Sequence, residues 1–213
     1  MDEEQEQRDT PPKPAPEPGQ AETPGADEGF VRAALVFYGV VGCVALLWRM
    51  WTPDASIFHP DVPPPDTVSL GPPLLAGLAM GGGALLASEA LTRFTRIGED
   101  LADVLGERLV GLGTADAILL AFASGIAEEM FFRGALQPAV GLVLASLLFG
   151  ACHFLPRREL MIWSAYAVLM GFAFGWLFEA TGHLVAPIAA HVLVNAVNLP
   201  RLAKRGEARE RGG

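Results

Sequence analysis

Residues 127–133, with the sequence AEEMFFR, place two adjacent carboxylates and an arginine at the end of an apolar run. That run, residues 115–127, carries only one other charge. Hydrocarbon offers such groups no water, so each must find a partner or shift its pKa. On a helix Glu129 and Arg133 face each other, whereas Glu128 points about 100° away toward a different partner. The fold must therefore bring further polar groups to this stretch.

Three later polar residues lie in similar apolar surroundings and are candidate partners. Taken singly, each has an ordinary structural explanation: His153 as a core or interfacial histidine, and His191 with Asn195 as a pair that hydrogen-bonds between helices. The glutamate pair would then be a helix end that faces water, and Arg133 an interfacial anchor. Because the polar groups fall on three separate apolar helices, one shared buried site explains them better.

The composition is that of a polytopic membrane protein. Of 213 residues, 51% are hydrophobic and 18% are charged, and the mean hydropathy is +0.35. Charges gather in the tails and between apolar runs, and the net charge of −9 owes much to the acidic N-terminal segment. This profile excludes an ordinary soluble domain. The sequence has no basic patch interleaved with aromatic residues, so nucleic acid is not an expected partner.

The chain divides into three parts. Residues 1–28 are rich in Pro, Glu, Gln and Asp with few large apolar side chains, so we expect a disordered acidic leader. Residues 29–200 are expected to form a membrane-embedded domain, with the polar motifs in a core at 101–200, and residues 201–213 form a basic cytoplasmic tail. The predicted fold class is all-α: a polytopic transmembrane helical bundle of about six spans with one amphipathic interfacial helix.

Six apolar runs are long enough, or nearly so, to cross a bilayer as helices. They are residues 30–51, 73–91, 115–132, 137–154, 160–178 and 183–199. Between the second and third runs, residues 93–112 alternate charged with apolar positions and carry one apolar stripe. That pattern predicts an amphipathic helix that lies on the membrane surface.

The positions of arginine and lysine predict how the chain is oriented in the membrane. If the N-terminus is cytoplasmic, six spans return the C-terminus to the cytoplasm together with nearly all the basic residues. Only Arg49 and Arg133 fall toward the other side, and Arg133 belongs to the buried polar stretch. The asymmetry follows the positive-inside rule and predicts an integral membrane protein with both termini cytoplasmic.

Three motifs, in order along the chain, make the sequence resemble a known family. They are Glu128-Glu129-x-x-x-Arg133, Phe149-x-x-x-His153 and His191-x-x-x-Asn195. In these motifs the chain is similar to the CPBP family of intramembrane glutamic endopeptidases, also called the CAAX prenyl protease and bacteriocin-processing, or ABI, family. The resemblance covers about residues 101–200. It implies an intramembrane endopeptidase of a bacterial cytoplasmic membrane, whose partners are the lipid bilayer and a membrane-associated peptide or protein substrate.

The resemblance also implies a chemical role for four of the motif residues. Glu128 would be the general base that polarises a water for attack on the scissile carbonyl, and His153 would hold or share the proton of that water. His191 and Asn195, one helical turn apart, would donate hydrogen bonds to the oxyanion as it forms.

The other motif residues would support this chemistry. Arg133 would pair with Glu129 and keep that carboxylate ionised, or would meet a carboxylate of the substrate. Phe149 lies one turn before His153 and would pack against the site or line its substrate pocket. This mechanism implies no metal ion and no other cofactor.

Two alternatives remain open at the level of sequence. One is a zinc-dependent membrane metalloprotease with His153, His191 and Glu128 as ligands, although the chain lacks the tight His-Glu-x-x-His spacing of many zinc sites. The other is a non-proteolytic membrane scaffold or immunity protein, a role that the resemblance also allows. The substrate, and whether it is prenylated, does not follow from these residues.

Overall fold

The computed structural model describes residues 28–52, 56–58, 69–154 and 161–212. Every regular element in these residues is a helix. The elements are α1 (Glu28–Met50), α2 (Gly71–Phe94), α3 (Arg96–Glu107), α4 (Thr114–Glu129), the π-helix η2 (Met130–Leu136), α5 (Gln137–Cys152), α6 (Met161–Thr181) and α7 (Val185–Gly212). The predicted all-α fold is therefore confirmed. The predicted leader, residues 1–28, lies almost wholly outside the described residues.

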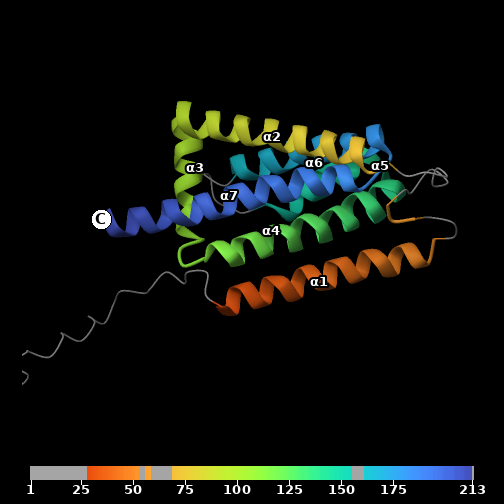
Figure 1. Cartoon of the computed structure of the whole chain (residues 1–213), viewed down its shortest axis with the longest axis horizontal. Coiled ribbons are helices and arrows are strands. Elements are labelled where there is room, and N and C mark those ends of the chain that lie inside the picture. The colour runs from red at the N-terminus through yellow and green to blue at the C-terminus, as the bar shows by residue number, and fades with distance from the viewer. Residues whose placement is uncertain (1–27, 53–55, 59–68, 155–160, 213) are drawn as a thin grey trace, which may run out of the picture.

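Long helices run side by side along the bundle, and one short helix crosses them. Figure 1 shows α1, α2, α4 and α7 along the long axis, with α3 lying across one end. Helix α3 has an apolar face that includes the buried Leu101 and Ala102, and a charged outer face. Its place across the end of the bundle agrees with the amphipathic interfacial helix predicted from residues 93–112.

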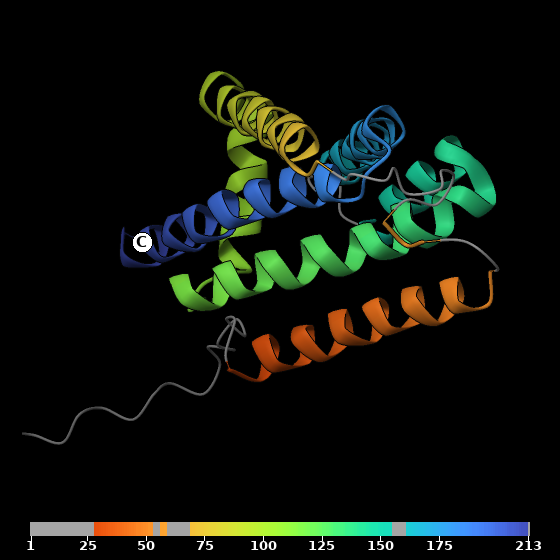
Figure 2. The same cartoon turned by 45° about the vertical axis from the view of Figure 1, so that its right-hand side comes forward.

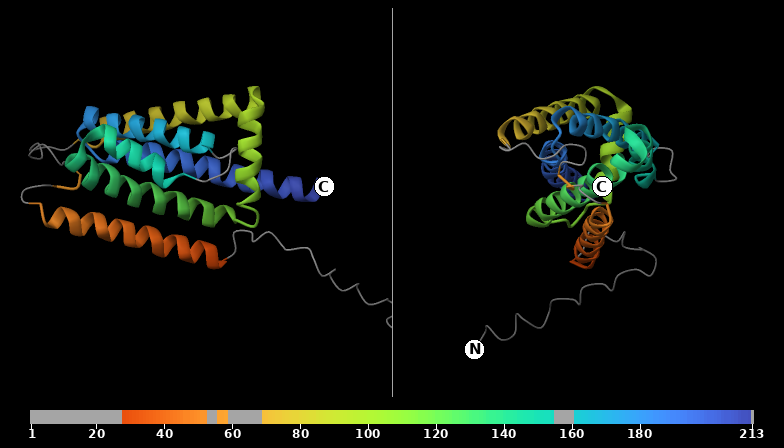
Figure 3. Two further views of the ribbon diagram at one scale, coloured as in Figure 1. Left: turned by 180° about the vertical axis from the view of Figure 1, so that it is seen from behind. Right: turned by 90° about the vertical axis from the view of Figure 1, so that its right-hand side faces the viewer.

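Five helices of the described residues are long and apolar enough to cross a membrane, and the third of them, Thr114–Cys152, covers α4, η2 and α5. This segment reverses direction, because Gly141 has a φ of 82° and interrupts the helical backbone. Figure 3 shows α5 returning along the bundle after the far end of α4. The structure thus gives five candidate spans where the sequence predicted about six, because the predicted runs 115–132 and 137–154 lie in one long segment that turns back on itself.

The last helix differs from the sequence prediction. The expected sixth span ended at residue 199 and left a basic tail, but α7 continues through Pro200 to Gly212. The reason is tertiary contact: the extension lies against α3, where Arg205 and Arg209 both donate to the Asp103 carboxylate. These contacts compensate for the backbone hydrogen bond that proline cannot make.

Close packing between α4 and α7 positions the polar residues. A Cβ atom added at Gly125 would lie 2.6 Å from Val192 Cγ2, so only glycine permits this approach. Gly125 stands one turn before Glu129, and Val192 directly follows His191. Figure 2 shows α7 lying along α4 through the middle of the bundle. Glu129 and His191 therefore meet inside the protein.

Candidate active site

Glu129 is the centre of a fully buried polar cluster. One of its oxygens, Oε1, accepts from Arg133 Nη1 at 2.9 Å and from His191 Nδ1 at 2.7 Å. The side chains of Glu129 and Arg133 are 0% and 1% exposed. The i,i+4 pair predicted from the sequence is therefore confirmed. His191 on α7, one of the three helices that were expected to share the site, contacts the same carboxylate.

Arg133 is enclosed on all its remaining sides. Its Nη2 donates to the backbone carbonyl of Gly171 on α6 at 3.0 Å. Its Cζ lies 4.5 Å from the centre of the Phe149 ring, with Phe132 and Phe174 slightly farther away. A desolvated guanidinium gains from such ring faces as well as from its carboxylate partner. The arginine thus ties η2 to α5 and α6.

Glu128 has a different environment from its neighbour. It is 9% exposed and points toward His153, whose Nε2 lies 3.7 Å from Glu128 Oε2. That separation is beyond hydrogen-bond length. Among the described residues no group hydrogen-bonds to Glu128 Oε2, and the same holds for Glu129 Oε2. Each of these two buried carboxylate oxygens can accept a hydrogen bond from a small molecule such as water.

His153 is held in one orientation by its own helix. Its Nδ1 lies 2.8 Å from the backbone oxygen of Phe149, and a carbonyl can only accept, so Nδ1 carries the hydrogen. The other ring nitrogen, Nε2, then faces Glu128. Phe149 itself is 3% exposed, and its ring centre lies 4.6 Å from that of His153. The predicted Phe149–His153 motif therefore forms one wall of the site.

The third predicted motif lies on α7. His191 stacks on Phe174, with ring centres 5.4 Å apart, and its Nδ1 is used by Glu129, which leaves Nε2 for other partners. Asn195 donates from Nδ2 to Ser124 Oγ on α4 at 3.0 Å. The structure thus gathers the predicted Glu128, Glu129, Arg133, Phe149, His153 and His191, and links Asn195 to the same helix pair through Ser124.

The motif stands where α4 gives way to the π-helix η2. Single π-turns inside α-helices are rare and are frequent at functional sites. Here the change comes directly after Glu129, so the two glutamates belong to α4 while Arg133 belongs to the wider turn. The local backbone is therefore irregular at the point where the polar groups converge.

Three contributors to the cluster were not predicted: Ser124, Phe174 and the carbonyl of Gly171. Ser124 lies four residues before Glu128 on the same face of α4, a spacing that could have revealed it. The carbonyl of Gly171 has no signal in the sequence, because every residue carries one. Phe174 is one of several aromatic residues in its apolar run, so periodicity alone does not single it out.

The ligand set of the zinc alternative is not gathered into one group. Among the described residues, no three His, Cys, Asp or Glu side chains are placed to hold a metal ion. His191 binds Glu129 through Nδ1, whereas His153 faces Glu128. The chelation experiment described below therefore tests whether the activity depends on a metal ion.

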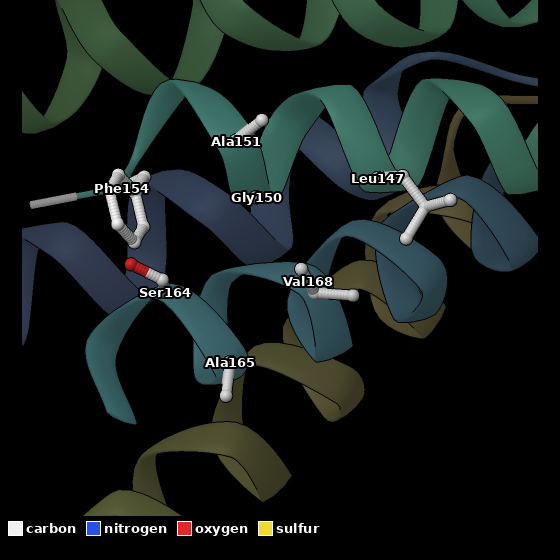
Figure 4. Close-up of a pocket in the computed structure, with 7 residues that line it drawn as sticks. All are labelled: Leu147, Gly150, Ala151, Phe154, Ser164, Ala165 and Val168. Atoms are coloured by element: carbon white, nitrogen blue, oxygen red, sulfur yellow. The ribbon is translucent and has the colours of Figure 1, made fainter. Parts of the chain in front are cut away.

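An open apolar hollow of about 410 Å³ lies between α5 and α6 (Figure 4). Its lining is Leu147, Gly150, Ala151, Phe154, Ser164, Ala165 and Val168. None of these is a predicted site residue, but the Ser164 hydroxyl donates to the backbone oxygen of His153 at 3.1 Å. The hollow is thus next to the histidine wall of the site and does not contain the glutamates.

Comparison with known proteins agrees with the motifs. Residues 111–197 match the family of type II CAAX prenyl endopeptidase Rce1-like proteins. An uncharacterized protein, YpbD of Bacillus subtilis (strain 168), is 42% identical over 82 residues, which is 38% of this chain and 42% of that relative. The chain thus matches less than half the length of YpbD, and no solved structure matches it. All three motifs fall inside the matched segment, so residues 111–197 of this integral membrane protein are similar to the CPBP/CAAX protease family that the motifs indicate.

Proposed function

We propose that the chain is an intramembrane endopeptidase that hydrolyses a peptide bond in a membrane-associated substrate. The observation that carries this proposal is the unequal treatment of two adjacent buried glutamates. Glu129 is fixed by Arg133 and His191, whereas Glu128 faces a histidine without a direct hydrogen bond. One carboxylate is therefore structural, and the other is available to act as a base.

In this proposal Glu128 and His153 hold the attacking water between them. Both the carboxylate and the unprotonated Nε2 accept hydrogen bonds, so one water can donate to each and present its oxygen to the substrate. As that oxygen bonds to the scissile carbonyl carbon, Glu128 takes one proton. The proton then passes to the leaving amine as the C–N bond breaks, so that water and peptide yield an acid and an amine.

His191 and Asn195 are proposed to stabilise the oxyanion. Because Nδ1 of His191 donates to Glu129, its Nε2 can donate only when the ring is protonated. Asn195 has a second amide hydrogen besides the one directed at Ser124.

The substrate class is proposed from the setting of the site. The polar cluster is enclosed by helices that are apolar enough to cross a membrane, so a substrate must reach it from the bilayer or from the membrane surface. We therefore propose a membrane-associated peptide or protein. The name of the matched family refers to CAAX prenyl processing, and the experiment below compares prenylated with unprenylated peptides.

The test compares membranes that contain the wild-type protein with membranes that contain Glu128→Gln, which keeps the size of the side chain and removes the base. Quantifying new protein termini by mass spectrometry should reveal cleavages that disappear in this variant. Glu89→Gln is the matched control, because Glu89 is exposed on α2 and pairs with Arg201 away from the site.

The purified protein should in addition cleave a quenched peptide that contains one of the identified sites, or a farnesylated CAAX peptide beside its unprenylated copy. Identical termini in the Glu128→Gln and wild-type membranes, with no peptide cleaved, would favour the scaffold alternative.

A further inference from the structure

Helix α1 lies outside the matched segment, yet it packs directly against the motif helix. Figure 1 shows α1 and α4 running side by side, with α1 at the outer edge of the bundle. A Cβ atom added at Gly42 would lie 3.9 Å from Ala127 Cβ, and the rings of Trp48 and Phe131 meet edge to face, 6.2 Å apart. The two contacts place α1 beside the continuous α4–η2 segment, with both running in the same direction.

This register brings one tyrosine of α1 to the site. Tyr38 stands one turn before Gly42 on the same face, and Gly42 is level with Ala127, the residue before Glu128. Side chains on a helix lean toward its N-terminus, so the Glu128 side chain reaches back to the level of Tyr38. Tyr38 is half-buried.

The two side chains interact directly. The Tyr38 hydroxyl lies close enough to the Glu128 carboxylate for the two groups to interact. An ionised carboxylate only accepts, so the phenol is the donor. Hydrogen bonds to ionised groups are about twice as strong as those between neutral groups. The proposed base therefore has one donor group within reach, on a helix that carries none of the three motifs.

We propose that Tyr38 is a positioning residue for Glu128: its hydroxyl fixes the carboxylate so that Oε2 stays directed at His153 and at the attacking water. This inference rests on the proposed function, because positioning matters for turnover only if Glu128 is the base. It gives α1 a part in the chemistry besides packing.

The chain provides a matched control for this tyrosine. It contains two tyrosines, and the other is Tyr166 on α6. The Tyr166 hydroxyl is also buried, but it has no hydrogen-bond partner among the described residues. Tyr38→Phe and Tyr166→Phe therefore remove the same atom from two buried settings, of which only one contains the Glu128 interaction.

The kinetic test uses the full-length protein in detergent and the quenched peptide defined above. Tyr38→Phe should lower kcat by about 10- to 100-fold, the cost of one hydrogen bond to a charged group, with little change in KM. Tyr166→Phe should retain the wild-type kcat. The thermal midpoint of Tyr38→Phe should stay near that of Tyr166→Phe. A wild-type kcat in Tyr38→Phe would overturn the proposal, as would a loss of kcat matched by an equal loss of folded protein.

A second measurement needs no substrate and separates this inference from the proposed function. In a Tyr166→Phe background Tyr38 is the one remaining tyrosine, so the ultraviolet resonance Raman doublet of tyrosine reports its phenol alone. Adding Glu128→Leu, which removes the acceptor and keeps an apolar side chain of similar size, should shift that doublet. An unchanged doublet would overturn the contact even if the protein is an active protease. A shifted doublet in a protein that cleaves nothing would confirm the contact and refute the proposed function alone.

Discussion

At the scale of single residues, the site depends on a salt bridge with no access to water. Glu129 and Arg133 are fully buried, so neither charge can be hydrated if the other is lost. Removing one partner of such a pair typically costs about 3–5 kcal/mol, because the remaining charge is buried and uncompensated. The pair therefore supports the fold as well as the proposed chemistry.

We accordingly expect Arg133→Ala to lower the thermal midpoint and the yield of protein in detergent. Arg201→Ala is the control, since Arg201 is 61% exposed and pairs with Glu89 at 3.8 Å. Exposed pairs contribute about 0–1 kcal/mol, so this variant should unfold like the wild type. Equal thermal midpoints for the two variants would show that water reaches the Arg133 guanidinium.

Asn195 should behave differently from Glu128 in a cleavage assay. Loss of one oxyanion donor typically lowers kcat by about 10²–10³, so Asn195→Ala should keep a measurable trace of activity. Glu128→Gln removes the base and should fall below detection. If Asn195→Ala retained the full rate, its amide would serve only the Ser124 contact seen in the structure.

Residue patterns could predict some of these contacts and not others. The Glu129–Arg133 pair followed from spacing, because two opposite charges one turn apart in an apolar helix have few other partners. The bond from Arg133 to the Gly171 carbonyl could not be predicted, since it depends on the relative placement of η2 and α6. Tyr38 was missed for a similar reason: it lies far from the motifs in sequence and meets Glu128 only through the α1–α4 packing.

At the scale of elements, the apolar runs predicted the helices but not how two of them are joined. Residues 137–154 were expected to form one continuous span, yet the backbone breaks at Gly141. That break, together with the π-helix before it, allows the chain to reverse without a long loop. Likewise, contacts with α3 extend α7 beyond its apolar run, and such contacts are invisible to local patterns.

The break at Gly141 gives a test of this connection. With φ of 82° and ψ of 164°, it has a backbone conformation open almost only to glycine, so Gly141→Ala should destabilise the protein by about 1–3 kcal/mol. An added Cβ atom would touch nothing within 4 Å, so any loss must come from the backbone. Gly82→Ala is the matched control: it is helical, has equal space, and should be neutral or slightly stabilising. Equal unfolding midpoints for both variants would place Gly141 in an ordinary helix.

At the scale of the whole molecule, the described chain begins and ends at the same end of the helical bundle. Figure 1 shows the start of α1 and the end of α7 at the same end, whereas the end of α1 lies at the opposite end. Together with the positive-inside asymmetry this supports the prediction that both ends of the described chain face the cytoplasm. A reporter fused after Gly212 should therefore be cytoplasmic, and one inserted after Thr52 should lie on the other side. Reporters that appear on the same side would contradict this topology.

The most direct test of the central claim, that Glu128 activates the attacking water, is the cleavage rate of the purified protein before and after chelation of metal ions. The wild-type protein should keep its rate in the chelator, because a poised carboxylate needs no metal ion to deprotonate water during attack. In the same assay Glu128→Gln should show no detectable cleavage. Loss of wild-type activity on chelation, with recovery on adding zinc, would contradict the claim and make His153 and His191 ligands of a catalytic metal ion.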